Sequence, residues 1–351
     1  MAIVKELKEL RKKYPVKTFA DRDETAHILV EKNKTEPITV LERLLLLWII
    51  VINFHDSGKI EGAFSCDSSC HGCSFCQKMC KAALTCILLI CGYCYDHDQE
   101  IRRPSVLKSH NLNRYILSNI EFSVDEWKKR PFIKTVVAGM LYVLRINSSG
   151  DIENLTHAIN MVNLAYANPH VRVGFWAKNV KDVEKAFDIV GKPDNLRFIQ
   201  SSPMIGFSCE PSKYADLIFV VCPDEETVME MIRQGGVPCN GKKCKECGWK
   251  CYLPEELGGW AKGSIVVEFL RCTPAQRARI LQAYWAERKR REAIKELEVI
   301  RKEGRPINGV YDIRKHPERD GWFVVDGEIG LHTYQVNSPE EARLLYWKER
   351  A

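Results

Sequence analysis

Short apolar runs and longer amphipathic segments alternate through the middle of the chain. Four apolar runs have the length and composition of buried strands, at residues 136–146, 171–178, 196–202 and 216–222. The segments between them, such as residues 152–167, space their apolar residues as a helix does. Because parallel strands need long crossover connections, which are usually helices, this order predicts an α/β fold with a parallel sheet.

The repeated strand–helix units limit the architecture to two forms. About four such units fit either a partial or complete TIM-like barrel or an open doubly wound sheet. In both forms, ligands bind at the carboxyl ends of the parallel strands. We therefore expect a functional site at that edge of the sheet.

Changes of pattern along the chain predict four regions. Residues 1–60 form an N-terminal helical segment, and residues 61–272 form a cysteine-rich α/β metal-binding core. Residues 273–304 are expected to be one long charged helix. Residues 305–351 predict three short strands and a helix, which together make a small C-terminal β-β-β-α module.

Composition and charge narrow the class of protein. Of the 351 residues, 45% are hydrophobic and 28% are charged, as in ordinary soluble globular proteins. The longest apolar run, residues 44–54, is shorter than the roughly 20 residues of a membrane span, so it predicts a core helix running into a strand. The N-terminus is charged and lacks the apolar stretch of a secretory signal, which favours a cytoplasmic protein.

Two features bear on a nucleic-acid partner. The formal net charge of +6 is mild and permits such a partner without requiring one. The charged run at residues 286–297 is typical of a solvated helix face. The helix that contains it is expected to begin with a capping box of Thr273 and Gln276. The C-terminal module is similar to the three-strand-plus-helix modules at the ends of some phage integrases. That resemblance implies DNA contact, but the preferred interpretation of the module is a packing appendage.

Cysteines are concentrated in two segments. Eight of the fifteen lie within residues 66–94, and four lie within residues 239–251. In a reducing compartment, such groups are more often metal ligands than disulfides. We therefore predict twelve metal ligands: Cys66, Cys70, Cys73, Cys76, Cys80, Cys86, Cys91, Cys94, Cys239, Cys244, Cys247 and Cys251.

The cysteine spacings favour iron–sulfur clusters, most simply of the 4Fe–4S type. Residues 70–80 contain C-x2-C-x2-C-x3-C, the run with which bacterial ferredoxins bind such clusters. The pattern C-x4-C-x2-C occurs at residues 86–94 and again at residues 239–247, where Cys251 completes the group. Zinc is the alternative, above all for the second group, because four thiolates also suit a tetrahedral zinc ion. Disulfide bonds are a third interpretation of the grouped cysteines.

Residues 66–73 contain C-x3-C-x2-C, a spacing similar to that of radical S-adenosylmethionine enzymes. The resemblance implies that three thiolates hold a four-iron cluster whose open iron binds and cleaves S-adenosylmethionine. Against it, no glycine-rich segment of the kind typical of those enzymes follows the first predicted strand.

Five stretches taken together resemble the gene product 88-like family of phage and prophage proteins: CGYCYD, VLRINSSGD, NPHVRVGFWAKN, KPDNLRFIQSS and CNGKKCKECGWKCY. The resemblance implies metal ligands at Cys66, Cys91, Cys94, Cys239, Cys244, Cys247 and Cys251. The thiols at Cys70, Cys73, Cys76, Cys80 and Cys86 go beyond the family pattern and leave the number of clusters open. No particular reaction is implied.

Polar residues follow three of the predicted strands, where ligands of α/β proteins bind. Glycine permits close approach of a ligand to the backbone, and the first amides of a helix favour anionic groups. Asp151 could instead cap the following helix. We predict a cofactor site formed by Ser149, Gly150, Asp151, Lys178, Asn179 and Ser201.

Three functions are consistent with these patterns. The first is an iron–sulfur protein, in its sharpest form a radical S-adenosylmethionine-like enzyme acting on a small-molecule substrate. The second is a non-catalytic zinc or iron–sulfur protein that binds nucleic acid or a protein partner. The third is a redox or electron-transfer protein. No membrane partner is expected.

Overall fold

The fold is taken from a computed structural model of the chain. It describes residues 2–55, 59–70, 75, 77–78, 87–93, 100–130, 141–239, 243–303, 310–315, 322–326 and 330–334. The chain divides into two compact units, Met1–Arg277 and Ala278–Ala351, and each is described by itself.

The first unit begins with three helices, α1 (Ala2–Lys13), α2 (Phe19–Thr35) and α3 (Val40–Ile49). Thr18 and Thr39 cap α2 and α3, and in each case the side chain of the third helical residue returns a hydrogen bond to the cap backbone. The apolar run at residues 44–54 is divided as expected, because α3 ends in it and strand β1 begins in it.

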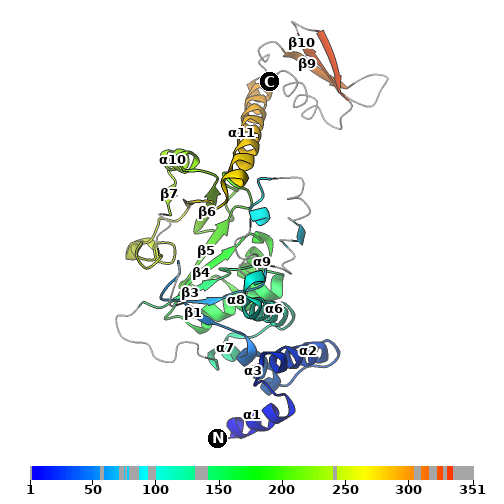
Figure 1. Cartoon of the computed structure of the whole chain (residues 1–351), viewed down its shortest axis with the longest axis vertical. Coiled ribbons are helices and arrows are strands. Elements are labelled where there is room, and N and C mark those ends of the chain that lie inside the picture. Colours follow the sequence, from blue (N-terminus) through cyan, green and yellow to red (C-terminus); the bar gives the residue numbers. More distant parts are fainter. Residues whose placement is uncertain are drawn as a thin grey trace. The chain divides into compact units, whose positions relative to one another are not determined.

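One sheet of eight described strands forms the centre of this unit (Figure 1). Its strands are β1 (Asn53–His55), β2 (Ala63–Cys66), β3 (Val143–Ile146), β4 (Arg172–Ala177), β5 (Leu196–Ser201), β6 (Leu217–Cys222), β7 (Val237–Pro238) and β8 (Ser264–Phe269). Their order is β1-β2-β3-β4-β5-β6-β8-β7. Strand β1 runs antiparallel to β2, and the other neighbours are parallel.

This topology confirms the α/β fold with a parallel sheet. From β2 to β6, the strands lie side by side in chain order, without the reversal that defines a doubly wound sheet. The described strands form a linear order from β1 to β7, so the barrel form of the prediction is not confirmed. The first strand predicted at residues 136–146 is shorter than expected, because β3 begins at Val143 and residues 131–140 lie outside the described part.

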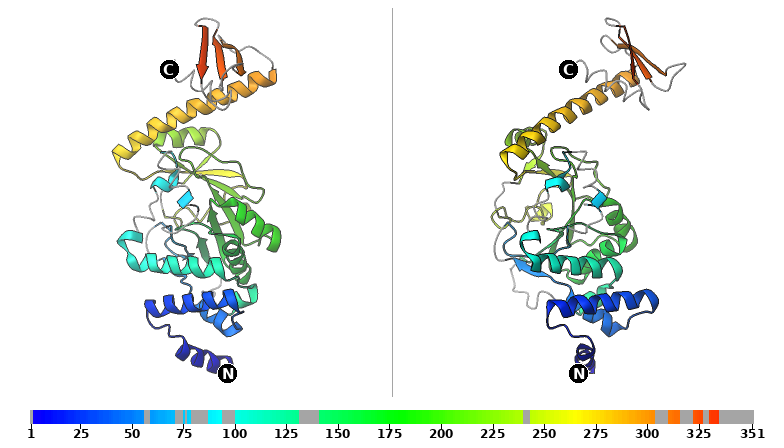
Figure 2. Two further views of the ribbon diagram at one scale, coloured as in Figure 1. Left: turned by 90° about the vertical axis from the view of Figure 1, so that its right-hand side faces the viewer. Right: turned by 45° about the vertical axis from the view of Figure 1, so that its right-hand side comes forward.

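Helices connect the strands and form a layer on one face of the sheet (Figure 2). They include α6 (Pro104–Asn119), α7 (Val124–Lys128), α8 (Leu155–Ala167), α9 (Val180–Val190) and α10 (Glu225–Arg233). Alternate residues of the central strands, such as Phe175 and Phe198, pack with α8 and α9 in the main hydrophobic core. The predicted crossover helices are therefore present. Each packs an apolar stripe against the sheet.

The opposite face of the sheet is covered by the loop that contains the second cysteine segment. Trp249 and Tyr252 of that loop pack with Val143, and Cys251 packs with Trp176. Gly174 makes room for this packing, because a Cβ at this position would lie 2.5 Å from Cε1 of Tyr252.

The second unit contains most of α11 (Pro274–Glu303), which the predicted capping box of Thr273 and Gln276 opens. It also contains an antiparallel sheet of β9 (Val310–Lys315), β10 (Trp322–Asp326) and β11 (Gly330–Tyr334). The three strands expected in the C-terminal module are thus confirmed, and the helix expected after them lies outside the described residues. Among the described helices, none has the length and apolar character needed to span a membrane.

Candidate functional site

The loops that follow β2 and β3 are joined at the carboxyl edge of the sheet. The carboxylate of Asp67 accepts hydrogen bonds at Oδ1 from the Ser148 amide at 2.7 Å and from the Ser148 hydroxyl at 2.6 Å. The Ser68 amide donates to the Ser149 carbonyl at 3.3 Å, and the Ser68 hydroxyl donates to the Asp151 carbonyl at 3.0 Å. These hydrogen bonds therefore hold residues 66–70 and 147–151 together.

Glycine is required at the closest approach of these two loops. Gly150 has a φ of +74°, and a Cβ at this position would lie 2.2 Å from the carbonyl oxygen of Ser68. Asn147, three residues earlier, also has a positive φ of 58°, and its side-chain amide donates to the Trp176 carbonyl at 3.3 Å. The local backbone is thus shaped by contact between loops rather than by a helix start.

The structure places five of the six predicted cofactor residues in the loops after β3 and β4. The buried carboxylate of Asp151 accepts from the amides of Lys178 at 2.9 Å, Ile152 at 2.7 Å and Asn179 at 3.5 Å. Burial raises the pKa of Asp151, and these amides oppose that shift. Asp151 therefore ties the loop after β3 to the loop after β4, a role different from both the ligand contact and the helix cap considered from sequence.

Ser201, the sixth predicted residue, is the last residue of β5 and is partly buried. It pairs in register with Phe219 of β6, at a strand end two strands away from β3. Its hydroxyl thus belongs to the same edge of the sheet, as expected.

A buried carboxylate lies beside Cys70 and was not anticipated from the sequence. Glu100 accepts hydrogen bonds from the Cys70 amide at 3.3 Å, the Cys70 thiol at 3.2 Å and the Ser69 hydroxyl at 3.0 Å. Its Oε1 lies 2.8 Å from Nδ1 of His110. Burial would raise the pKa of Glu100, but the hydrogen bonds from His110, Cys70 and Ser69 outweigh it and lower the pKa to about 2.

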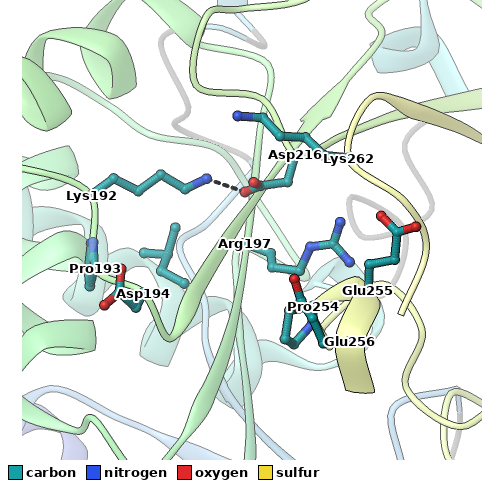
Figure 3. Close-up of a pocket in the computed structure, with 10 residues that line it drawn as sticks. Lys192, Pro193, Asp194, Arg197, Asp216, Pro254, Glu255, Glu256 and Lys262 are labelled. Atoms are coloured by element: carbon teal, nitrogen blue, oxygen red, sulfur yellow. Dashed lines mark hydrogen bonds and ion pairs between the residues drawn. The ribbon is translucent and has the colours of Figure 1, made fainter. Parts of the chain in front are cut away.

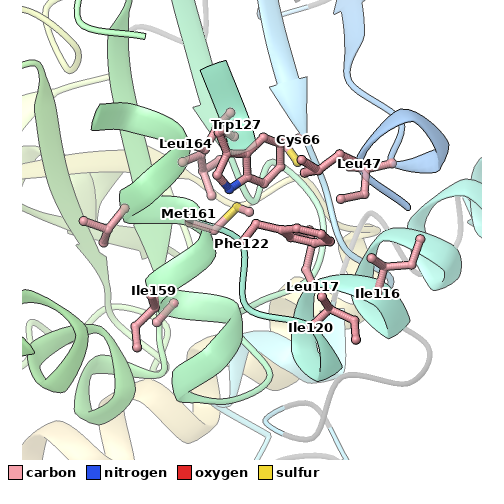
Figure 4. Close-up of a cluster of buried hydrophobic side chains, with 14 of the residues drawn as sticks. Leu47, Cys66, Ile116, Leu117, Ile120, Phe122, Trp127, Ile159, Met161 and Leu164 are labelled. Atoms are coloured by element: carbon pink, nitrogen blue, oxygen red, sulfur yellow. The ribbon is translucent and has the colours of Figure 1, made fainter. Parts of the chain in front are cut away.

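Cys66 has surroundings unlike those of Cys70. Its side chain lies in the main hydrophobic core with Trp127 and Leu47, on the helix-covered face of the sheet (Figure 4). Burial, followed by the nearby charge of Asp67, raises the pKa of the Cys66 thiol to about 12. The two described cysteines of the C-x3-C-x2-C spacing therefore face an apolar core in one case and a polar network in the other.

The first cysteine-rich segment comes back to the sheet beside the chain that follows β5. Cys91 lies in a 3-10 helix, η1 (Ile90–Tyr93). The Ile90 amide donates to the Pro203 carbonyl at 2.9 Å, and the residue before η1, Leu89, forms an antiparallel bridge with Met204. The segment thus leaves from β2 and comes back beside the chain that follows β5. Its remaining predicted ligands lie outside the described residues: Cys73, Cys76, Cys80, Cys86 and Cys94.

All four cysteines of the second segment are described, and they share one face of the sheet. Cys239 follows β7 and donates its amide to the Val267 carbonyl of β8 at 2.7 Å, while the Cys244 amide donates to the Lys59 carbonyl at 2.7 Å. Cys247 donates its thiol to the Cys244 carbonyl at 3.1 Å. Cys251 contacts the apolar layer around Trp176, on which Cys239 also packs.

The four thiols lie within electrostatic reach of one another. Burial raises the pKa of Cys251 to about 12, and the charges of Cys239, Cys244 and Cys247 add to the shift. Burial likewise raises the pKa of Cys244, against the opposing charges of Arg145 and Lys59. Within the described ranges, no group of three or more His, Cys, Asp or Glu side chains is arranged to hold a metal ion. The thiols are neighbours without enclosing a single-ion site.

A cavity of about 300 Å³ lies at the opposite edge of the sheet, near the amino ends of β5 and β6 (Figure 3). Lys192 and Asp216 form an ion pair in its wall, and the Arg197 guanidinium donates to the carbonyls of Leu253 and, at 2.9 Å, Trp260. Arg197 thus ties the loop after the second cysteine segment to β5. Because residues at the amino ends of such strands usually serve stability, we assign this cavity a structural role.

A comparison with models of protein families gives a match. The family model described as gene product 88 matches residues 44–255, which include both cysteine segments and the strands from β1 to β7. No curated protein and no solved structure matches the chain.

Proposed function

The chain belongs to the gene product 88 family, and from this premise we propose that it is an iron–sulfur protein with a cluster on the sheet face opposite the helices. Cys239, Cys244, Cys247 and Cys251 would hold that cluster. The observation that carries the proposal is that these four thiols, from one short loop, lie within electrostatic reach of one another against the sheet.

The donor set of this loop fits a cluster. Thiolates are the usual ligands of iron–sulfur clusters, and both apolar shielding and nearby positive charge tune them. Here Trp176 and Trp249 supply the apolar surroundings, and Arg145 supplies positive charge. A zinc ion needs thiolates converging at about 2.3 Å. Iron is favoured over zinc by the ferredoxin-like run C-x2-C-x2-C-x3-C at residues 70–80 of the same chain.

A second cluster in the first cysteine segment is the finer part of the proposal. This segment starts at the carboxyl end of β2 and returns beside the chain after β5, at the edge where α/β proteins bind ligands. Cys70 starts the ferredoxin-like run with Cys73, Cys76 and Cys80. Cys86, Cys91 and Cys94 supply further thiols.

In its most specific form, the proposal is that the protein has a partial-barrel fold and cleaves S-adenosylmethionine. The sequential order of β2 to β6 is compatible with it. This form requires the Cys66 thiol to leave its apolar core, because the C-x3-C-x2-C spacing holds the cluster with the open iron. A four-thiolate cluster held from Cys70 onward leaves Cys66 in place but has no open iron. The polar edge formed by Ser149, Lys178 and Asn179 would then contact the cofactor.

The alternative of a nucleic-acid partner gains no support from the described part of α11. Arg288 pairs with Glu292, and Arg290 and Arg291 pair with Glu287, as on a solvated helix face.

Anaerobic purification followed by iron, sulfide and zinc analysis and electron paramagnetic resonance tests the proposal. We expect iron and sulfide in equal amounts and a cluster signal after reduction. Cys251→Ala should lose one cluster, while Cys209→Ala, which removes an isolated cysteine, should keep the wild-type iron content. Zinc without iron would refute the proposal. Formation of 5′-deoxyadenosine from S-adenosylmethionine and a reductant tests its sharpest form, which a complete absence of product would refute.

A further inference from the structure

Arg145 lies between the sheet and the second cysteine loop. It is the third residue of β3, and its guanidinium carbon is 4.5 Å from the ring centroid of Trp176 on β4. Its register partner on β4 is Gly174, whose missing side chain leaves space for the ring of Tyr252. Tyr252 follows Cys251 directly in the chain. The packing of Trp176 and Tyr252 therefore keeps the guanidinium beside the cysteine loop.

The positive charge of Arg145 reaches the cysteines of this loop. It opposes the effect of burial on the thiols of both Cys244 and Cys251. Lys59 also acts on Cys244, but it forms an ion pair with Glu268, which neutralises much of its field. An arginine side chain stays protonated under all conditions in which the protein is folded. Arg145 is thus a permanent positive charge next to the group of thiols.

We infer that Arg145 is a positioning residue of the second cluster, whose charge compensates the thiolates and raises the reduction potential of the cluster that they hold. This inference rests on the proposed function. Four thiolates give the cluster a net negative charge, and one-electron reduction by an external reductant makes it more negative. A fixed positive charge stabilises the reduced state more than the oxidised state, because Coulomb energy scales with the charge of the cluster.

A redox titration of the second cluster tests the inference. The signal that Cys251→Ala removes identifies this cluster, and the full-length protein is titrated anaerobically with dithionite. At the potential where the wild-type cluster is half reduced, Arg145→Gln should lower the ratio of reduced to oxidised cluster about tenfold. This corresponds to about 59 mV for a one-electron couple. Arg145→Lys keeps the charge and should stay close to the wild type. Arg172→Gln, on the neighbouring strand, is the matched control.

Glu268→Gln provides a test with the opposite sign, which remains available if Arg145→Gln fails to fold. It releases Lys59 from its ion pair, so the potential should rise. An unchanged potential in folded Arg145→Gln, or in Glu268→Gln where the first variant does not fold, would overturn the inference. A wild-type protein without any iron–sulfur signal refutes the proposed function instead, so the two failures are distinguishable.

Discussion

Asp67 and Ser148 hold the loops after β2 and β3 together through one carboxylate oxygen. Oδ1 of Asp67 accepts both the amide and the hydroxyl of Ser148, at 2.7 and 2.6 Å, and both side chains lie at the edge of the sheet that carries the candidate site. This pair connects the residue after Cys66 to the polar loop that follows the next strand. The contribution of this pair to the free energy of unfolding can be measured.

Replacing Asp67 by alanine should destabilise the protein by about 3 kcal/mol. The substitution leaves the amides of Ser148 and Ser149 without their acceptor, and hydrogen bonds to charged groups are worth roughly 1.5–3 kcal/mol each. Urea denaturation measures the loss. Ser148→Ala removes only the hydroxyl donor and should cost about 1 kcal/mol. Equal losses in the two variants would contradict the central role of Asp67.

Gly150→Ala should cost at least about 3 kcal/mol, because the new methyl group would meet the Ser68 carbonyl at a backbone that favours glycine. Gly258 is the matched control. Its φ of +84° is similar, but nothing lies within 4 Å of an added Cβ, so Gly258→Ala should cost only about 1–2 kcal/mol. Thermal or urea unfolding compares the two. Similar losses would show that the loops can move apart at little cost.

Glu100 should make stability depend on pH in the acid range. Its pKa is lowered from 4.5 to about 2 in the folded protein, so its contribution is complete above about pH 4.5 and is lost as the pH falls toward 2. The shift corresponds to about 3 kcal/mol. In metal-free protein, the difference in unfolding free energy between wild type and Glu100→Gln should shrink over this interval. A difference that is independent of pH would exclude a buried, ionised Glu100.

Cys66 and Cys70 should differ in their effect on iron content. Cys66→Ala removes a sulfur from an apolar core and should cost about 1–2 kcal/mol of stability while leaving the iron content unchanged. Cys70→Ala should lower the iron content of anaerobically purified protein, because Cys70 begins the ferredoxin-like run. Loss of iron in Cys66→Ala to the same extent would identify Cys66 as a ligand and support the C-x3-C-x2-C form of the proposal.

Some elements of the fold were predictable from the pattern of apolar residues in the sequence. The strands β4, β5 and β6 and the helices α8 and α9 were predictable, since continuous apolar runs and 3.6-residue periodicity reflect burial directly. The convergence of Asp151 with Lys178 and Asn179 followed from parallel strands ending at one edge. The role of Asp151 did not follow, because a sequence does not say whether backbone amides or a ligand will occupy a carboxylate.

Other partners are far apart in the chain and left no local signal. Glu100 meets Cys70 across 30 residues and Ser149 across 49. Only a charged residue placed just after the cysteine-rich segment could have hinted at this contact. The contact of Arg145 with Trp176 likewise depends on the register of β3 and β4, which the sequence does not show.

The sequence by itself determined the α/β class, the membership of the chain in its family, and the presence of two thiol-rich segments. These properties depend on residue type and spacing along the chain. The tertiary structure decided the direction in which the described thiols face. Cys66 points into the helix-covered core, Cys70 toward Glu100, and Cys251 toward the opposite face of the sheet. The physical reason for Cys66 is that alternate strand residues face opposite sides of a sheet, and only the packed fold determines which side carries the core. Cys70 and Cys251 lie in loops, and their directions depend on contacts with residues far away in the chain.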